Sequence, residues 1–199
     1  PLLVMLQFVD PNKLIGSPET RFTPLHILAD LADPKDYSTH KMQLILAKQL
    51  IEHGANVNLS IPWGNTPLHK ACHSGVVTNL DFVEYLLEAG ADPNTQNTWG
   101  MTPLMYTTPY APGTAKFLLN RPATDANLTD RSGSSFLAKV RHQTVKSSSS
   151  KIADPDNPQQ VQEEFVIQQW LVIEEMLVER GAHDTWITAV YHAIYQGYR

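Results

Sequence analysis

Cysteine is almost absent from this sequence, since Cys72 is the one cysteine among 199 residues. No disulfide can therefore form within the chain. This is typical of a reducing compartment, and we expect a cytoplasmic or nuclear location. Long apolar runs are lacking too, and none approaches the roughly 18–20 residues of a membrane span. Phosphate-cradling glycine loops, Gly-x-Ser-x-Gly elbows and His-Glu-x-x-His pairs are also missing. We therefore expect a protein that is not an enzyme, with no cofactor and no small-molecule substrate.

Charge of either sign is sparse. Lys and Arg number 15 and Asp and Glu number 20, which gives a net charge of −5 with neutral histidine. This balance argues against a nucleic-acid-binding surface over the whole protein. Apolar residues make up 42% of the sequence, which is enough to build a core and too much for a chain disordered throughout. The apolar opening lacks an initiator methionine and a basic segment, so we interpret it as the interior of a longer protein and not as a signal peptide.

A four-residue motif recurs along the chain. Thr-Pro-Leu-His stands at Thr23–His26 and again at Thr66–His69, and Thr-Pro-Leu-Met stands at Thr102–Met105. Threonine is a good N-cap, and proline suits the first turn of a helix, where its missing N–H would have had no partner. Each copy therefore predicts the start of a short helix.

A second motif follows each copy of the first. It reads Glu-His-Gly-Ala-Asn-Val-Asn over 52–58, Glu-Ala-Gly-Ala-Asp-Pro-Asn over 88–94 and, more weakly, Ala-Thr-Asp-Ala-Asn over 123–127. Apolar residues at helical spacing precede the first two copies, and Gly54 and Gly90 stand where those helices would end. These two glycines are 36 residues apart, and a fixed period of this size is typical of stacked repeats.

The alternating motifs resemble the ankyrin repeat, whose period is about 33 residues and whose first helix opens with Thr-Pro-Leu-His. The resemblance implies an all-α repeat solenoid of helix–loop–helix units with hairpin-like fingers, which forms a single domain with two or more long inserts. It also implies a protein or peptide partner, bound on the concave face that the fingers and first helices form. The expected units are a partial repeat over 1–12, repeats over about 13–58, 59–94, 95–127 and 128–184, an insert over 143–160 and a capping helix over 185–199.

Departures from the regular spacing predict inserts between the helices of a unit. We expect about ten extra residues near 33–37 and about three near 76–79. In the last unit, the serine run 147–150 and the Pro- and Asp-rich run 153–158 indicate a loop. A long helix with an apolar stripe is expected over about 159–180. Composition leaves open whether the insert is a mobile loop or a lid over the concave face.

Three groups of polar residues could suggest a metal or a modification. His69, Cys72 and His73 share a helical face, but a closed metal site needs four ligands, and the resemblance gives His69 a hydrogen-bonding role between repeats. The Asp and Asn residues of the second motif recur once per turn. Bonds to nearby backbone explain them better than calcium does, so we expect no metal. The resemblance adds hydroxylation of Asn58 and Asn94 by an asparaginyl hydroxylase as a minor alternative.

The strongest indication of a binding site is aromatic. Trp63 and Trp99 each precede a glycine that stands two residues before the threonine of a first helix. They therefore occupy equivalent places on adjacent fingers, and tryptophan is a favoured anchor at protein interfaces. Alternatively, each ring folds down on its own finger or on the neighbouring repeat. The predicted partner-binding residues are Trp63, Trp99, Asn65, His73, Gln96, Met101, Tyr110 and Arg131.

The sequence is also compatible with other functions. The basic stretch 131–151, with Arg131, Lys139 and Arg141, could contact an acidic ligand or nucleic acid, or could be a solvated helix end and loop. Nucleic acid is the less favoured partner because the chain is acidic. The repeats could instead recruit substrate to, or regulate, an adjacent catalytic domain, or could act as a rigid spacer. Exposed tryptophans on the fingers would count against the spacer.

Overall fold

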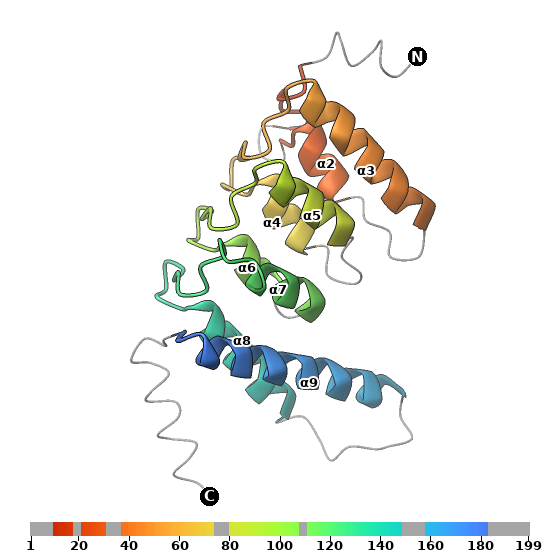
Figure 1. The fold of residues 1–199 in the computed structure, drawn as a ribbon. Coiled ribbons are helices and arrows are strands. Elements are labelled where there is room, and N and C mark those ends of the chain that lie inside the picture. Colours follow the sequence, from red (N-terminus) through yellow and green to blue (C-terminus); the bar gives the residue numbers. More distant parts are fainter. Residues whose placement is uncertain are drawn as a thin grey trace, which may run out of the picture.

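The computed structural model of this chain describes residues 10–17, 21–30, 37–73, 80–107, 111–148 and 158–182. Its helices form consecutive pairs, stacked in a row from one end of the molecule to the other (Figure 1). The loops that join one pair to the next emerge on one side of the stack, so the predicted all-α repeat solenoid is confirmed. The pairs are α2 (Pro24–Asp30) with α3 (Tyr37–Glu52), α4 (Pro67–His73) with α5 (Leu80–Glu88), α6 (Pro103–Tyr106) with α7 (Pro112–Leu119), and α8 (Phe136–Ser148) with α9 (Pro158–Glu179).

The recurrent threonine–proline pair starts three helices as predicted. Helices α2, α4 and α6 begin at the proline of each copy. The preceding threonine accepts a hydrogen bond through its hydroxyl from a backbone N–H three residues on, at 3.4 Å for Thr23, 3.5 Å for Thr66 and 3.4 Å for Thr102. Each cap satisfies one of the N–H groups that a helix start leaves unpaired.

The histidines of the first motif connect neighbouring units. Nε2 of His26 lies 2.9 Å from the carbonyl oxygen of Asn65, and Nε2 of His69 lies 3.0 Å from that of Met101. Both rings are fully buried. Burial lowers the pKa of each to about 4, so each ring is neutral and donates its Nε2 proton to the next unit. The role that the resemblance implies for His69 is therefore observed.

The predicted glycines follow the ends of α3 and α5, which are the second helices of their pairs. Gly54 and Gly90 have φ angles of +90° and +92°, in the left-handed region that glycine adopts without a Cβ penalty. The residue after each donates its N–H back to the helix, Ala55 to Leu50 and Ala91 to Leu86, both at 2.9 Å. These bonds satisfy carbonyls that the helix end would otherwise leave without partners.

An asparagine in each turn bonds across to the following unit. Asn58 donates its Nδ2 to the carbonyl of Gly90, and its Oδ1 accepts from the N–H of Asp92, both at 2.9 Å. Asn94 does the same with Ala123 and Asp125, at 2.7 and 2.8 Å. Asn12 makes the matching pair of bonds to Gly54 and Asn56. Three bridges of the same two bonds therefore join four consecutive turns, and we call them the asparagine ladder (Asn12, Asn58 and Asn94).

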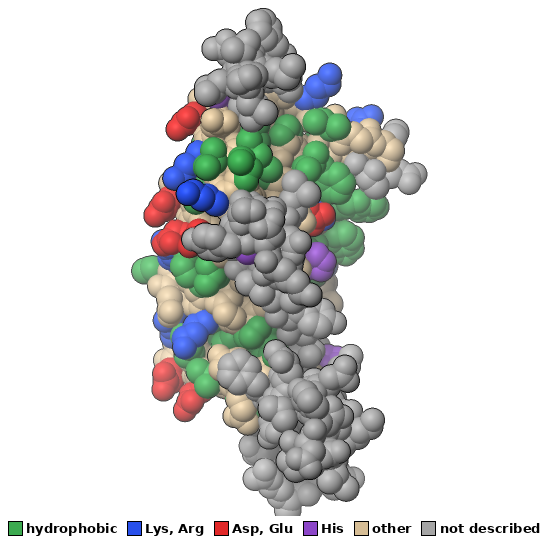
Figure 2. Space-filling model, turned by 90° about the vertical axis from the view of Figure 1, so that its right-hand side faces the viewer, with side chains coloured by type: hydrophobic (Ala, Val, Ile, Leu, Met, Phe, Trp, Pro, Cys, Tyr) green, Lys and Arg blue, Asp and Glu red, His purple; other side chains and the backbone are tan. Residues whose placement is uncertain are grey.

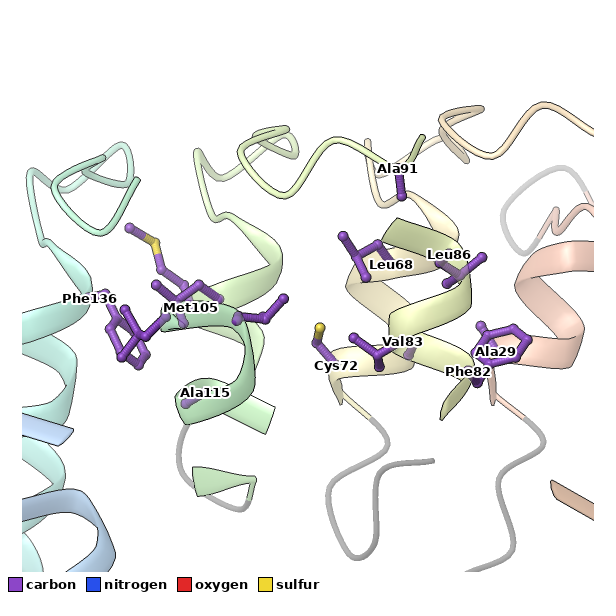
Figure 3. Packing of buried hydrophobic residues seen from close by; sticks show 14 of the residues in the cluster. Ala29, Leu68, Cys72, Phe82, Val83, Leu86, Ala91, Met105, Ala115 and Phe136 are labelled. Atoms are coloured by element: carbon purple, nitrogen blue, oxygen red, sulfur yellow. The ribbon is translucent and has the colours of Figure 1, made fainter. Parts of the chain in front are cut away.

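The core lies between the two helices of each pair and between adjacent pairs. Figure 3 shows Leu68 of α4 beside Val83 and Leu86 of α5, and Met105 of α6 near Phe136 of α8; each of these side chains is 0–1% exposed. No single pair could bury these residues by itself, so stacking supplies the core. One apolar cluster extends from Leu25 of α2 to Leu177 of α9.

The extra residues of the first and last units lengthen helices. Helix α3 has 16 residues, against 9 in α5 and 8 in α7. The expected insert 143–160 is partly helical. Residues 143–148 continue α8, so the predicted loop is wrong for the serines at 147 and 148, and α9 begins at Pro158, next to the expected start of the long helix. Helix α8 as a whole contacts α9, and Arg141 of α8 is paired with Glu174 of α9. Helix α9 itself covers the long helix expected over about 159–180.

Several expected segments lie outside the described residues. These are positions 1–9 of the partial repeat, the capping helix over 185–199 and most of the inserts near 33–37 and 76–79. Among the helices that the structure describes, none combines the length and the apolar character needed to cross a membrane. On the face opposite the fingers, acidic and basic side chains are interspersed and form no patch of one sign over the described parts (Figure 2).

Candidate functional site

Three hairpin-like fingers project from the stack between successive helix pairs. Each begins and ends with residues joined by a backbone hydrogen bond of 3.0 Å, from Ile61 to Asn65, Asn97 to Met101, and Asp130 to Ser134. A glycine with φ near +75° completes each turn, at Gly64, Gly100 and Gly133. The side chain of Asn97 supports its finger from inside, because its Oδ1 accepts from the N–H groups of Trp99 and Met101. The fingers are therefore built the same way at a regular interval.

Adjacent fingers are bonded to one another. The carbonyl of Trp63 accepts hydrogen bonds from both the N–H and the hydroxyl of Thr98, at 3.1 and 2.9 Å. The carbonyl of Trp99 accepts from the N–H of Arg131 at 2.9 Å. These bonds fix the backbone of both tryptophans relative to the next finger.

The two tryptophan rings stack on each other. Their centroids are 5.9 Å apart and their planes differ by 16°, an offset stack of the kind that aromatic pairs favour. Trp63 is still 51% exposed and Trp99 48% exposed. The rings therefore lean on each other across the two fingers and present a continuous half-exposed aromatic surface, which we call the tryptophan pair.

Two depressions adjoin the tryptophan pair. The first, of about 500 Å³, lies among the fingers and is lined by Trp63, Thr98, Trp99, Met101, Asp130, Arg131 and Ser132. The second, of about 310 Å³, lies over α4 and α6. We call the first helix of each pair the inner helix. This depression is lined by Asn65, Lys70, His73, Met101, Met105 and Tyr106. Met101 lines both, so together they form one track from the fingertips down to α4 and α6. We call this the concave track.

Tyr106 belongs to this surface, although it was not among the predicted binding residues. Its ring meets the rings of His69 and His73 edge to face, with centroids 5.3 and 5.5 Å apart. Its hydroxyl accepts a hydrogen bond from Nδ2 of Asn97 at 2.9 Å, and burial raises its pKa above the ordinary value. Its position could have indicated its place, because it follows Thr102 by four residues, as Lys70 follows Thr66 on the preceding inner helix.

Most charges along the concave track already have partners. Burial would raise the pKa of Asp130, but hydrogen bonds from Lys139, Ser132 and the backbone of Ser134 bring it below the ordinary value. Its Oδ2 lies 2.6 Å from Nζ of Lys139. Lys70 lies 3.5 Å from a carboxylate oxygen of Asp30 and 5.1 Å from the centroid of the Phe22 ring.

The structure brings five of the eight predicted binding residues together as accessible groups. Trp63, Trp99, His73 and Arg131 are exposed, and Met101 is half-buried between the two depressions. Asn65 also lines the track, but it is buried, and its Oδ1 accepts from Nδ2 of Asn97 at 2.8 Å. Its amide therefore stabilises the fingers.

The remaining two predicted binding residues lie elsewhere. Gln96 lines neither depression, and its amide donates to the carbonyls of Gly100 and Thr129 at 2.7 and 2.8 Å. Tyr110 lies outside the residues that the structure describes. The accessible candidates therefore come from two fingers, the start of a third, and the end of one inner helix.

The basic stretch is partly neutralised within the fold. Arg141 bonds to a carboxylate oxygen of Glu174 at 2.7 Å, and Lys139 is paired with Asp130. Lys151 and the side chain of Lys146 fall outside the described residues. Two of the cations that could have attracted an acidic ligand to this stretch are thus already used between elements of the same chain.

The polar groups singled out as metal or modification candidates also have internal roles. Cys72 is buried, which raises the pKa of its thiol well above the ordinary value, and Nε2 of His69 is used by Met101. Within the described residues, no group of three metal-ligating side chains comes together. Asn58 and Asn94 hold neighbouring units in the asparagine ladder. Their hydroxylation remains a prediction.

Comparison with known proteins agrees with this geometry. A family model described as "Ankyrin repeats (3 copies)" matches the chain over residues 3–97 and 38–130. Together the two matches span the helices from α2 to α7 and end at Asp130, the first residue of the third finger. A search of curated proteins finds no match to this chain.

Proposed function

The chain belongs to the ankyrin repeat family, and from that premise we propose that it binds a protein or peptide partner along the concave track. Ankyrin repeats are generally protein–protein interaction modules, and the family is typically non-catalytic. The surface assigned here consists of the tryptophan pair on the fingers, Met101 between the two depressions, and Tyr106 and His73 on the inner helices.

The observation that carries this proposal is the half-exposed tryptophan pair. A tryptophan can bury roughly 200 Å², and about half of each ring remains exposed here. Covering that remainder would contribute about 2.5 kcal/mol per ring at ~25 cal/mol per Å². Exposed aromatic surface beside a depression is the composition expected of an interface centre, where tryptophan is enriched.

The rigidity of the fingers supports the same function. The carbonyls of both tryptophans are bonded to the following finger, and Asn97 holds the backbone of its own finger from inside. A partner therefore meets groups that are already positioned, and little conformational entropy is lost on binding. A spacer would not need large aromatic groups presented in this way.

The experiment is affinity capture from a lysate with the full chain and two matched double variants. In the first, Trp63→Ala with Trp99→Ala removes the tryptophan pair. In the second, Met42→Ala with Ile45→Ala removes two exposed apolar side chains of α3, which are 55% and 42% exposed and line neither depression. Captured proteins are identified by mass spectrometry, and folding of each variant is checked by circular dichroism.

We expect a protein that is captured by the wild type and the α3 variant and lost with the tryptophan variant. Loss of two such anchors should weaken binding more than about thirtyfold. Equal capture by all three proteins would exclude the concave track as the site, and the surfaces of α8 and α9 would be tested next.

A further inference from the structure

The concave track contains one cation without a partner. Arg131 stands at the fingertip end of the first depression and is exposed. Its backbone N–H is bonded to Trp99, which fixes where its side chain emerges. Among the described residues, no hydrogen bond, ion pair or ring contact engages its guanidinium.

The other polar side chains of that depression are already satisfied. Asp130 is paired with Lys139, Ser132 donates its hydroxyl to Asp130, and Thr98 donates its hydroxyl to Trp63. The depression therefore combines an apolar floor of tryptophan and methionine with a single uncompensated positive charge. It offers an incoming lysine or arginine no free carboxylate among the residues that line it.

The second depression also offers no partner to an incoming cation. Its lining includes Lys70 and the exposed His73 but no carboxylate. Lys70 is held at 3.5 Å by Asp30, which belongs to the preceding inner helix. The net charge of −5 is distributed over the whole chain, and salt screens exposed charges beyond about 8 Å at physiological ionic strength. Local charge therefore decides which ligand is favoured within the track.

We propose, on the basis of the proposed function, that the partner presents a short linear segment in which an aspartate or glutamate lies next to bulky apolar residues. The carboxylate pairs with Arg131, whose planar guanidinium can donate two parallel hydrogen bonds to it. The apolar side chains cover the tryptophan pair and enter the depression at Met101. Two depressions of about 500 and 310 Å³ that meet at one residue suit several side chains of one extended segment.

The test is selection from a display library of random short peptides on the immobilised full chain, at physiological ionic strength. We expect the enriched peptides to share an acidic residue beside an aromatic or large aliphatic one. The strongest peptide is then labelled, and its dissociation constant is measured by fluorescence polarisation with the wild type, Arg131→Ala and Arg21→Ala. Arg21 is exposed and lines neither depression, and its replacement removes the same net charge, so it is the matched control.

Arg131→Ala should weaken binding about fivefold, as expected for a partly exposed charge pair, and Arg21→Ala should change it less than twofold. Replacing the acidic residue of the peptide by its neutral amide should weaken binding to the wild type by the same factor. The same replacement should not weaken binding to Arg131→Ala any further. That pattern would show that the two groups contact each other.

Failure of this inference is distinguishable from failure of the proposed function. Enriched peptides that are neutral or basic, or acidic peptides whose affinity does not depend on Arg131, would overturn the inference. If those peptides still required Trp63 and Trp99, the concave track would stand as the binding site. Peptides bound equally by Trp63→Ala with Trp99→Ala would overturn both, and a library without enriched peptides would refute a linear acidic segment as the ligand.

Discussion

At the scale of single residues, two glycines permit the contact between fingers. A Cβ on Gly64 would lie 2.9 Å from the backbone nitrogen of Thr98, and one on Gly100 would lie 2.7 Å from that of Arg131. Both distances are shorter than real Cβ contacts, and the obstacle is backbone, which cannot swing aside. These positions therefore need glycine for space as well as for their φ angles of +75° and +74°.

Gly90 allows the two requirements to be separated. It has a φ of +92°, but a Cβ at this position would meet nothing within 4 Å. We expect Gly90→Ala to cost about 1–2 kcal/mol of unfolding free energy from the left-handed backbone alone, and Gly100→Ala to cost about 2–4 kcal/mol because the third finger must also move. Urea unfolding of the two variants would measure the difference. Equal losses would show that the finger contact contributes nothing.

Residue positions on the fingers could be predicted from the sequence, but their contacts could not. Equivalent spacing placed Trp63 and Trp99 on adjacent fingers, which the structure confirms. Their mutual stacking depends on the distance between fingers, which no residue pattern encodes. Asn65 was predicted to contact a partner, but it closes its finger and is buried, and its amide oxygen accepts a hydrogen bond from Asn97. That pairing depends on side chains 32 residues apart.

At the scale of helices, α9 is held by one face. Trp170 is 1% exposed, and its ring meets that of Phe136 in α8 edge to face with centroids 6.3 Å apart. Ile173 and Leu177 continue the buried stripe, each 1% exposed, whereas the adjacent Leu171 is 42% exposed. Neighbouring apolar residues on one helix thus have different roles, set by their angle around the helix axis.

This difference gives a matched pair of substitutions. Trp170→Ala should destabilise the last helix pair by about 3–5 kcal/mol, since it removes a large buried side chain and leaves a cavity. Leu171→Ala should change stability by no more than about 0.5 kcal/mol. Thermal unfolding followed by circular dichroism would compare them. A large loss with Leu171→Ala would mean that another segment covers it.

Helix starts were more predictable than helix lengths. Threonine, proline and the terminal glycines are local signals, so the starts of α2, α4 and α6 and the ends of α3 and α5 follow from short motifs. The extension of α8 to Ser148 has no such signal, because residues 143–148 include serine and threonine, which are weak helix formers. Helix α8 contacts α9, and its Arg141 pairs with Glu174 of that helix. Both contacts join residues far apart in the sequence, so no local motif in α8 could have indicated them.

At the scale of the whole molecule, successive units are joined by different means along the stack. Buried histidines connect the first unit to the second and the second to the third. At the next position Met105 replaces histidine and packs near Phe136. Arg180 at the end of α9 donates to the carbonyl of Leu119, which joins the last unit to α7. Only the first two of these connections include a titratable ring.

Stability should therefore fall on mild acidification. The pKa of His26 and His69 is about 4 in the folded chain, against 6.5 for an unperturbed ring. Between these two values the unfolded state takes up protons that the folded state does not. The contribution of the two neutral rings to the free energy of unfolding is therefore complete above pH 6.5 and is lost as the pH falls toward 4. The loss is about 1.4 kcal/mol per histidine for each pH unit in that window.

Urea unfolding at about pH 7.5 and pH 5 would measure this loss, with His69→Gln as the comparison. The variant lacks one of the two buried rings, so its pH dependence should be about half that of the wild type. The same pH dependence in both proteins would exclude His69 as a source of acid sensitivity.

The asparagine ladder also has a mechanical consequence. Its bridges lie one after another along the stack, so a pull on the two ends would load them in series and every interface would carry the full tension. Each bridge consists of two hydrogen bonds with lengths of 2.7–2.9 Å. A chain of similar links in series does not stretch evenly but yields at its weakest member. Under tension the protein should therefore lengthen in discrete steps, one repeat at a time.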